Sequence, residues 1–157
     1  MEDQKKELTL ERTFDAPRDL VFKAWTDKEL VKKWWGPRGV TNPVCEVDAV
    51  PGGKINIVML AGPELGELAG QEWPMTGKFE EVAEPEKLVY TANAIVDGKE
   101  VLTTRNTITF EEQDGKTKMT AHILVTKTTP EAEGPLAGME MGWDQQLDKL
   151  VEFIKAR

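Results

Sequence analysis

The feature that most constrains the fold of this chain is a long apolar stripe in residues 134–157. Its apolar side chains recur at steps of three and four, as they do on one face of an α-helix. They are Leu136, Met139, Trp143, Leu147, Leu150, Val151 and Ile154. At a rise of about 1.5 Å per residue, such a helix spans roughly 30 Å. It needs an equally long apolar partner, and because the preceding chain is mostly strand-like, we expect that partner to be a sheet.

Glycines interrupt the start of this stripe at Gly134, Gly138 and Gly142. Each glycine inside a helix costs about 1 kcal/mol relative to alanine. Either the helix begins after these glycines, or their bare surface lets another group approach closely. We favour the later start.

The first forty residues predict one strand followed by two short helices. Residues 7–14 alternate as a strand does. Asp15 is a candidate N-cap with Pro17 in the first turn, and Thr26-Asp27 separates this helix from a second one. Gly36-Pro37 ends the second helix.

Alternating segments fill most of the chain up to the final helix. They cover residues 44–50, 54–60, 73–82, 88–94, 101–112 and 116–126. Asp97-Gly98 and Asp114-Gly115 are hairpin signals, which predict antiparallel pairing. The fold class is therefore α+β: a curved antiparallel sheet of about six strands, two short helices after the first strand, and a long C-terminal helix across the concave face.

Composition limits the class of partner. The 157 residues fit a single domain, 1–157, and the net charge of −8 comes from 20 basic and 28 acidic side chains. An acidic chain without basic runs is a poor ligand for nucleic acid. The apolar runs are far shorter than the about 20 residues of a membrane span. Cys45 is the single cysteine, so we expect no internal disulfide and a cytoplasmic location.

Several strings carry a resemblance to a known family. They are ERTFDAPRDLVFKAWTD (11–27), WWGP (34–37), VPGGKINIVM (50–59), Gly77 with Phe79, and GMEMGWDQQLDKL (138–150). In this order they resemble the START-like (SRPBCC, helix-grip) superfamily, and within it the bacterial branch related to the activator of heat-shock protein 90 ATPase. The resemblance implies a cavity between the sheet and the long helix that binds a hydrophobic or amphipathic small molecule. The segment after Gly62 departs from the family pattern. The family usually has a short polar loop there, whereas this chain has Leu65, Leu68 and Trp73.

Aromatic and methionine side chains on the inward phases are the candidate ligand-binding residues, because such sites are mostly apolar and thioethers adapt to irregular ligands. We expect near the cavity Trp143, Met139, Leu147, Met59, Trp73, Met75, Phe79, Phe110 and Met119. For Trp25 and Trp34 we favour ordinary core filling. A dry, fully packed interior would make all of these residues plain core.

Two other functions remain open at this stage. Recognisable catalytic, metal-ligating and cofactor motifs are lacking, so we expect no metal and no cofactor and favour a protein that is not an enzyme. A cyclase or dehydratase, as some superfamily members are, needs an ionisable group in the cavity. The candidates are Glu46, Asp48, Glu72, Tyr90, Arg105 and His122. Arg105 and His122 are expected to point outward. The family name also implies a co-chaperone module acting on a chaperone ATPase.

Overall fold

The chain folds as one curved sheet around one long helix, in a computed structural model that describes residues 7–156 apart from the side chains of residues 134 and 135. The helices are α1 (Arg18–Thr26), α2 (Lys28–Trp34) and α3 (Glu133–Lys155). The strands are β1 (Glu7–Phe14), β2 (Val40–Val47), β3 (Lys54–Ala61), β4 (Glu72–Ala83), β5 (Lys87–Val96), β6 (Lys99–Gln113) and β7 (Lys116–Thr128). Two short 3₁₀ helices, η1 (Pro63–Leu68) and η2 (Pro130–Ala132), complete the fold.

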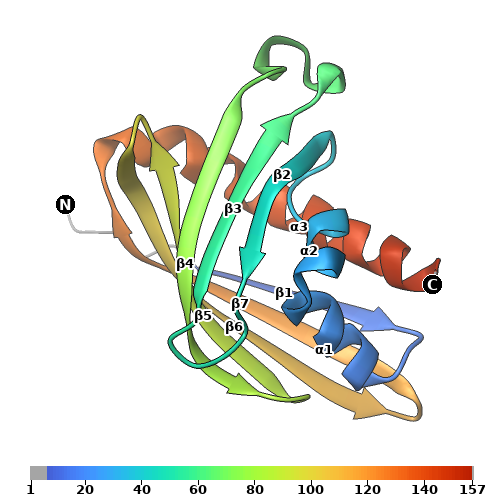
Figure 1. The fold of residues 1–157 in the computed structure, drawn as a ribbon. Helices are drawn as coiled ribbons and strands as arrows, with labels where there is room; N and C mark the ends of the chain where they lie inside the picture. Colours follow the sequence, from blue (N-terminus) through green and yellow to red (C-terminus); the bar gives the residue numbers. More distant parts are fainter. Residues whose placement is uncertain (1–6, 157) are drawn as a thin grey trace.

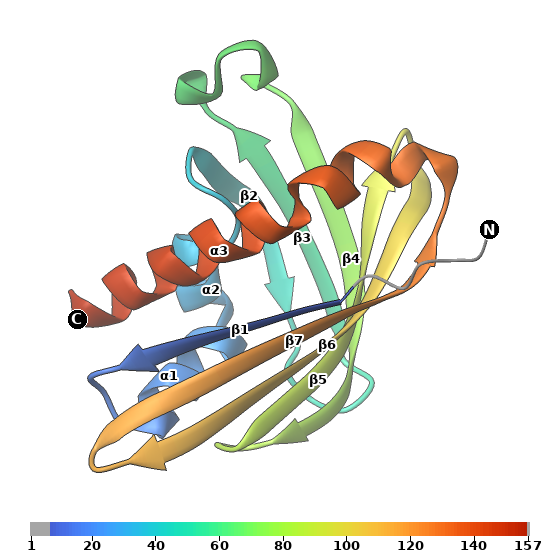
Figure 2. The same ribbon diagram turned by 180° about the vertical axis from the view of Figure 1, so that it is seen from behind.

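All seven strands form a single antiparallel sheet in the order β1-β7-β6-β5-β4-β3-β2. The sheet curls, and α3 lies across its concave side, while α1 and α2 cover the part near the β1 and β2 edges (Figures 1 and 2). Register shifts in the β2–β3, β4–β5, β5–β6 and β6–β7 pairs mark β-bulges. Bulges increase the local twist and bend of a strand, which lets a sheet wrap around a helix.

The predicted α+β architecture is confirmed, with corrections to its details. The sheet has seven strands rather than about six, and β2 begins at Val40 instead of residue 44. The segment between β3 and β4 contains η1. Pro17, not Asp15, occupies the N-cap position of α1. Asp27 does cap α2, because its side chain accepts a hydrogen bond from the Glu29 amide at 2.9 Å.

The late start predicted for the long helix is wrong. Helix α3 begins at Glu133, so Gly138 and Gly142 lie inside it. A Cβ atom placed on either glycine would meet nothing within 4 Å. These two glycines therefore face open space, and no neighbouring group in the described structure uses their bare surface for close approach.

The register fixes which side chains share the concave face. Directly paired residues of antiparallel strands point to the same side. One row across the sheet runs from Ile123 through Asn106 and Tyr90 to Phe79. The next row contains Thr104 and Ala92. These rows face α3, whose Leu147 and Leu150 are fully buried against the core.

Helix α3 is also held at the sheet edge by charge. Arg12 on β1 pairs with Asp144 and, at 3.1 Å, with Asp148, both on α3.

Within the described residues, no helix is long and apolar enough to cross a membrane.

Candidate functional site

Four tryptophans join the three helices into one cluster. Trp25 of α1 meets Trp34 and Trp35 with ring centroids 4.8 and 6.1 Å apart. Trp143 of α3 stacks on Trp25 at 6.4 Å and meets Trp35 edge-on at 6.1 Å. The Trp34 indole nitrogen donates to the Ala24 carbonyl oxygen at 2.9 Å, so its polar end is satisfied inside the core. Offset and edge-on packing of this kind stabilises each pair by about 0.5–1.5 kcal/mol beyond burial.

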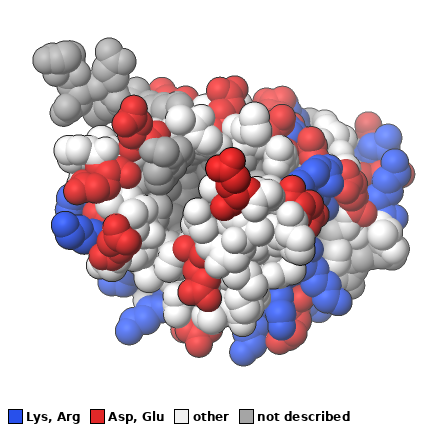
Figure 3. All heavy atoms as spheres, turned by 90° about the horizontal axis from the view of Figure 1, so that it is seen from above, with Lys and Arg blue, Asp and Glu red and all other residues white. Residues whose placement is uncertain are grey.

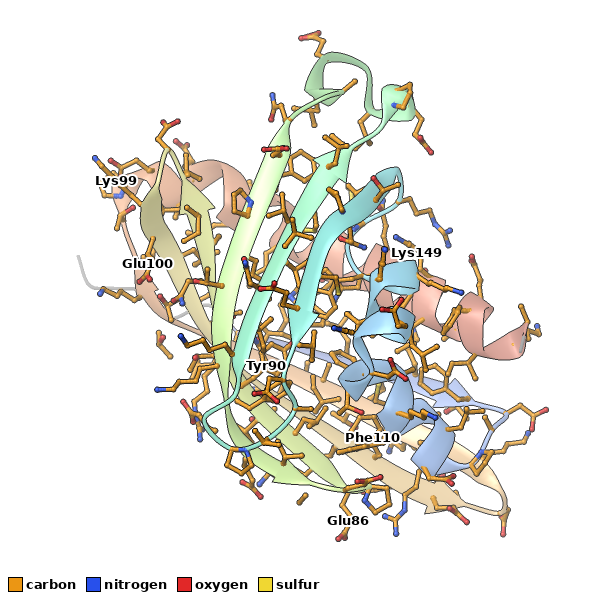
Figure 4. All side chains as sticks on the ribbon, viewed as in Figure 1. Glu86, Tyr90, Lys99, Glu100, Phe110 and Lys149 are labelled. Atoms are coloured by element: carbon orange, nitrogen blue, oxygen red, sulfur yellow. The ribbon has the colours of Figure 1, made fainter. Side chains whose placement is uncertain are left out.

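A set of polar contacts then fastens α3 to the loop after α2. The Lys149 ammonium donates to the carbonyl oxygens of Trp35, Gly36 and Pro37 at 3.3, 3.2 and 3.3 Å. Its position on α3 beside this loop is visible in Figure 4. Partial burial lowers the pKa of Lys149, because it removes part of the water around the ammonium.

Two neighbouring glutamines on α3 extend this clamp. The Gly36 amide donates to Gln146 Oε1 at 2.7 Å, and the Arg38 amide donates to Gln145 Oε1 at 3.0 Å. One turn further on, Glu152 accepts from the Arg38 guanidinium at 2.6 Å. We call the contacts of Gln145, Gln146, Lys149 and Glu152 with residues 35–38 the C-terminal clamp.

An enclosed cavity of about 20 Å³ lies between α1, α2 and the sheet. It is lined by Trp25, Val31, Trp35, Val47, Ile55, Ile57, Met75, Phe79, Leu88 and Tyr90. A volume of that size holds about one water molecule. Nine of these ten side chains are wholly apolar or indole, and Tyr90 carries the one hydroxyl. Burial raises the pKa of Tyr90, so the phenol stays neutral.

The nine predicted ligand-binding residues fall into three groups. Met75 and Phe79 line the enclosed cavity, and the Phe79 ring lies 6.0 Å from that of Tyr90. A second group lies buried in the core outside the cavity lining. Its members are Met139, Leu147, Phe110 and Met119. Met119 Sδ lies 3.3 Å from the Trp25 indole nitrogen, and Phe110 packs edge-on against Phe22 at 5.3 Å.

The third group remains partly exposed. Trp143 lies on α3, while Met59 and Trp73 are register partners on β3 and β4. The Trp73 indole nitrogen donates to Gln71 Oε1 at 3.1 Å. Met59 shares the inward phase of buried Ile55 and Ile57 but stays partly exposed, and its side chain lies beside Gly36.

Other inward-facing positions on β5 are partly exposed as well. Ala92 and Ala94 pair with Gly77 and Met75 on β4, and both remain partly exposed. Across from the sheet, Leu136 and Trp143 of α3 are partly exposed as well. We call these inward-facing, partly exposed apolar residues of β3, β4, β5 and α3 the apolar seam.

The predicted candidates for catalysis lie mostly outside this interior. Arg105 is exposed and pairs with Glu80 at 2.9 Å, and His122 Nε2 lies 3.0 Å from Glu7 Oε2, as expected for outward side chains. Exposed positions are also occupied by Glu46, Asp48 and Glu72. Among the described candidates, only Tyr90 reaches the enclosed cavity.

A larger hollow of about 480 Å³ lies on the surface between α2 and β2. It is lined by Glu29, Lys32, Lys33, Val40, Thr41, Asn42 and Pro43. None of these residues lines the enclosed cavity. This hollow is a groove at the sheet edge with a mixed polar and apolar lining, separate from the helix–sheet interior.

Sequence reasoning missed most of the residues that line the enclosed cavity. The sequence pattern favours core filling for Trp25 and does not single out Trp35 as a ligand-binding residue. Ile55 and Ile57 carried a usable signal, because they share the strand phase of Met59. The approach of Trp25 and Trp35 to this strand depends on how α1 and α2 dock, and periodicity does not report docking.

The fold and its interior define a helix-grip domain of the START/SRPBCC class, with a curved antiparallel sheet closed around one long helix. The chain belongs to the family of Activator of Hsp90 ATPase homolog 1-like proteins, whose model matches residues 15–155. This finding confirms the resemblance read from the sequence.

Solved structures of bacterial proteins resemble this chain over nearly its whole length. A protein from Nitrosomonas europaea is 27% identical with a TM-score of 0.77, covering 96% of this chain and 94% of its own. One from Chromobacterium violaceum is 25% identical with a TM-score of 0.78, covering 94% of this chain and 96% of its own. The AHSA1 protein from Silicibacter pomeroyi shares the fold at 23% identity, with a TM-score of 0.78 and coverage of 96% and 99%. Among curated proteins, no match is found.

Proposed function

We propose that this protein binds a hydrophobic or amphipathic small molecule between the sheet and α3. The observation that carries the proposal is the apolar seam, where inward-facing side chains of both the sheet and the helix stay partly exposed. Met59, Ala92 and Trp143 pack against the core but keep part of their surface exposed. Entry of an apolar molecule would remove their surface from water. This burial would favour binding by about 25 cal/mol for each Å² of apolar surface.

Binding requires the interior to open. The enclosed cavity of about 20 Å³ is far smaller than the about 300–1,000 Å³ of ordinary ligand pockets. The C-terminal clamp holds the second half of α3, whereas Gly138 and Gly142 in the first half face open space. We therefore expect the first half of α3 to move away from the sheet when a ligand enters.

Tryptophan fluorescence provides a direct test. The protein is titrated with a library of apolar and amphipathic metabolites, and the melting temperature is followed with each compound. A true ligand is expected to give a saturable fluorescence signal and to raise the melting temperature. At a free ligand concentration of 100 times Kd, binding stabilises the folded state by about 2.7 kcal/mol. The signal is expected to shrink in Trp143→Phe, because Trp143 belongs to the apolar seam, and to persist in Trp34→Phe, because Trp34 is fully buried and lies outside the seam. Silence in both measurements across the library would contradict the proposal.

The family supports a second candidate, an interaction with a heat-shock protein ATPase. The test measures the ATPase rate of a bacterial Hsp90 with and without a molar excess of this protein. A rate that changes saturably would support the interaction. An unchanged rate together with no detectable complex would remove it.

A further inference from the structure

Two buried polar atoms on the concave face have no hydrogen-bond partner within residues 7–156. They are the Tyr90 hydroxyl oxygen and Asn106 Oδ1. Tyr90 is 3% exposed and Asn106 is 0% exposed. Leaving a buried polar group unpaired costs about 1–3 kcal/mol, so native proteins contain few of them. Two such atoms on the same face of the sheet therefore require an explanation.

The register brings these two residues together. Tyr90 on β5 and Asn106 on β6 are directly opposed in the antiparallel pair, so both side chains leave the same face of the sheet. Figure 4 shows Tyr90 near the middle of the curved sheet. The Tyr90 side chain lines the enclosed cavity beside α1 and α2.

A short polar path links Asn106 to the apolar seam. The Asn106 amide nitrogen donates to the Thr104 hydroxyl oxygen at 3.1 Å. Thr104 is directly opposed to Ala92, which belongs to the seam. The amide nitrogen of Asn106 is engaged in this hydrogen bond. Its carbonyl oxygen is an acceptor that has no donor among the described residues.

The surroundings exclude a charged ligand group at this position. Apart from Tyr90, no ionisable side chain lines the enclosed cavity among the described residues. Arg105, next to Asn106 in the chain, points to the other face and pairs with Glu80. Moving an unpaired charge into such a site is far more costly than moving a neutral polar group. Acidic side chains are also prominent on the face seen in Figure 3, and together with the net charge of −8 they disfavour the approach of an anion.

We propose that Tyr90 and Asn106 together bind the uncharged hydroxyl group of an otherwise apolar ligand. A hydroxyl both donates and accepts, so it can donate to Asn106 Oδ1 while it accepts from the Tyr90 hydroxyl. Ethers and ketones cannot donate, and carboxylates cannot donate and bring a charge. This inference rests on the proposed function and narrows its ligand class to alcohols and related hydroxylated apolar molecules.

The test compares three probes that share one apolar chain: 1-octanol, octyl methyl ether and octanoate. Affinities are measured by tryptophan fluorescence and calorimetry with the wild type, Asn106→Leu and Tyr90→Phe. The control variant is Asn93→Leu, because Asn93 lies in the opposite phase of β5 and bonds to Thr76 and Thr103. Circular dichroism and melting temperature verify the fold of each variant.

Wild type is expected to bind octanol about 10-fold or more tightly than the ether, the equivalent of one satisfied hydrogen bond. Asn106→Leu is expected to abolish this preference. Tyr90→Phe is expected to weaken octanol binding about 3- to 10-fold, while Asn93→Leu keeps the wild-type preference.

Distinct outcomes separate this inference from the proposed function. Equal binding of octanol and ether by the wild type overturns the inference but leaves an apolar ligand site in place. Tightest binding of octanoate, or a preference for octanol that survives in both variants, also overturns it. If wild type binds none of these probes but binds other apolar molecules without a hydroxyl, the inference fails and the proposed function stands. If nothing binds, both fail.

Discussion

At the scale of single residues, burial sets the chemistry of Cys45, the one thiol of the chain. Cys45 lies half-buried on β2, and its Sγ–H donates to the Lys28 carbonyl oxygen at 3.6 Å. Burial raises the pKa of this thiol from 9.0 to about 11, and the nearby ammonium groups of Lys28 and Lys32 only partly oppose that effect. Because the thiolate is the nucleophile, Cys45 is predicted to be inert at neutral pH.

The prediction is that iodoacetamide alkylates Cys45 about 100-fold more slowly in the folded protein at pH 8 than in urea, since two pKa units reduce the thiolate fraction by that factor. The folded rate is expected to climb as the pH approaches 11. A folded rate at pH 8 within threefold of the unfolded rate would contradict the prediction.

The same pKa fixes the sign of a stability effect. Below pH 9.0 the thiol is neutral in both states, and burial of the neutral group contributes its full stability. As the pH rises from 9.0 to about 11, the unfolded thiol ionises while the folded one does not, so stability is lost. Cys45→Ala is expected to remove this part of the alkaline decline in unfolding free energy, measured by urea denaturation at pH 8, 9 and 10.

At the scale of elements, α3 carries two glycines whose cost is not offset by close packing. Gly138 and Gly142 have no neighbour within 4 Å of an added Cβ atom. Gly138→Ala and Gly142→Ala are therefore each predicted to stabilise the protein by about 1 kcal/mol, the difference in helix propensity. Urea unfolding measures this change.

A glycine in the sheet gives the matched control. At Gly77 on β4 an added Cβ would collide with the Thr91 carbonyl oxygen of the neighbouring strand. Gly77→Ala is therefore expected to destabilise the protein, although alanine is the better residue in isolation. Destabilisation by the two helix variants as well would mean that α3 needs its glycines for a reason outside the described structure.

These glycines also explain how far sequence could predict the elements. The stripe predicted α3 and its buried face, but the glycines at positions 134, 138 and 142 suggested a later start. Their cost of about 1 kcal/mol each is smaller than the about 1.5–3 kcal/mol gained by burying one large apolar side chain. Met139, which lies among these glycines, is buried. The helix therefore extends through them, because packing outweighs propensity.

Strand boundaries failed for a similar reason. Val40 and Thr41 pair with Ala61 and Leu60, yet a register shift separates them from the regular pairing that starts at Val44. Alternation is lost across such a bulge, so the sequence pattern predicted only the regular part of β2.

At the scale of the whole molecule, the polar contacts between α3 and the loop after α2 lie in the C-terminal half of the helix. Strand periodicity placed Met75 and Phe79 on the inward phase, and both line the enclosed cavity. It could not give the cavity volume or the contribution of Trp25 and Trp35, since these follow from the docking of α1 and α2. The C-terminal clamp likewise joins residues more than 100 positions apart, which no local pattern predicts.

This asymmetry leads to a prediction about hydrogen exchange along α3. Residues 146–154 include the fully buried Leu147 and Leu150 and the polar contacts of Gln146, Lys149 and Glu152. Residues 136–143 include two glycines beside open space and the partly exposed Trp143. Because local opening is easiest where few buried contacts hold a segment, amides of 138–143 are expected to exchange at least about 10-fold faster than those of 147–154.

A bound ligand should change this gradient in one direction. If the molecule enters between the sheet and the first half of α3, the amides of 138–143 gain protection, whereas those of 147–154 change little. Hydrogen–deuterium exchange, read by NMR with and without the ligand found by fluorescence, measures both segments at once. Lys149→Met is the control variant, because loss of the clamp is expected to speed exchange in the second half as well. Uniform exchange along α3 in the free protein would mean that the helix opens as one unit, and ligand entry would then require its complete release from the sheet.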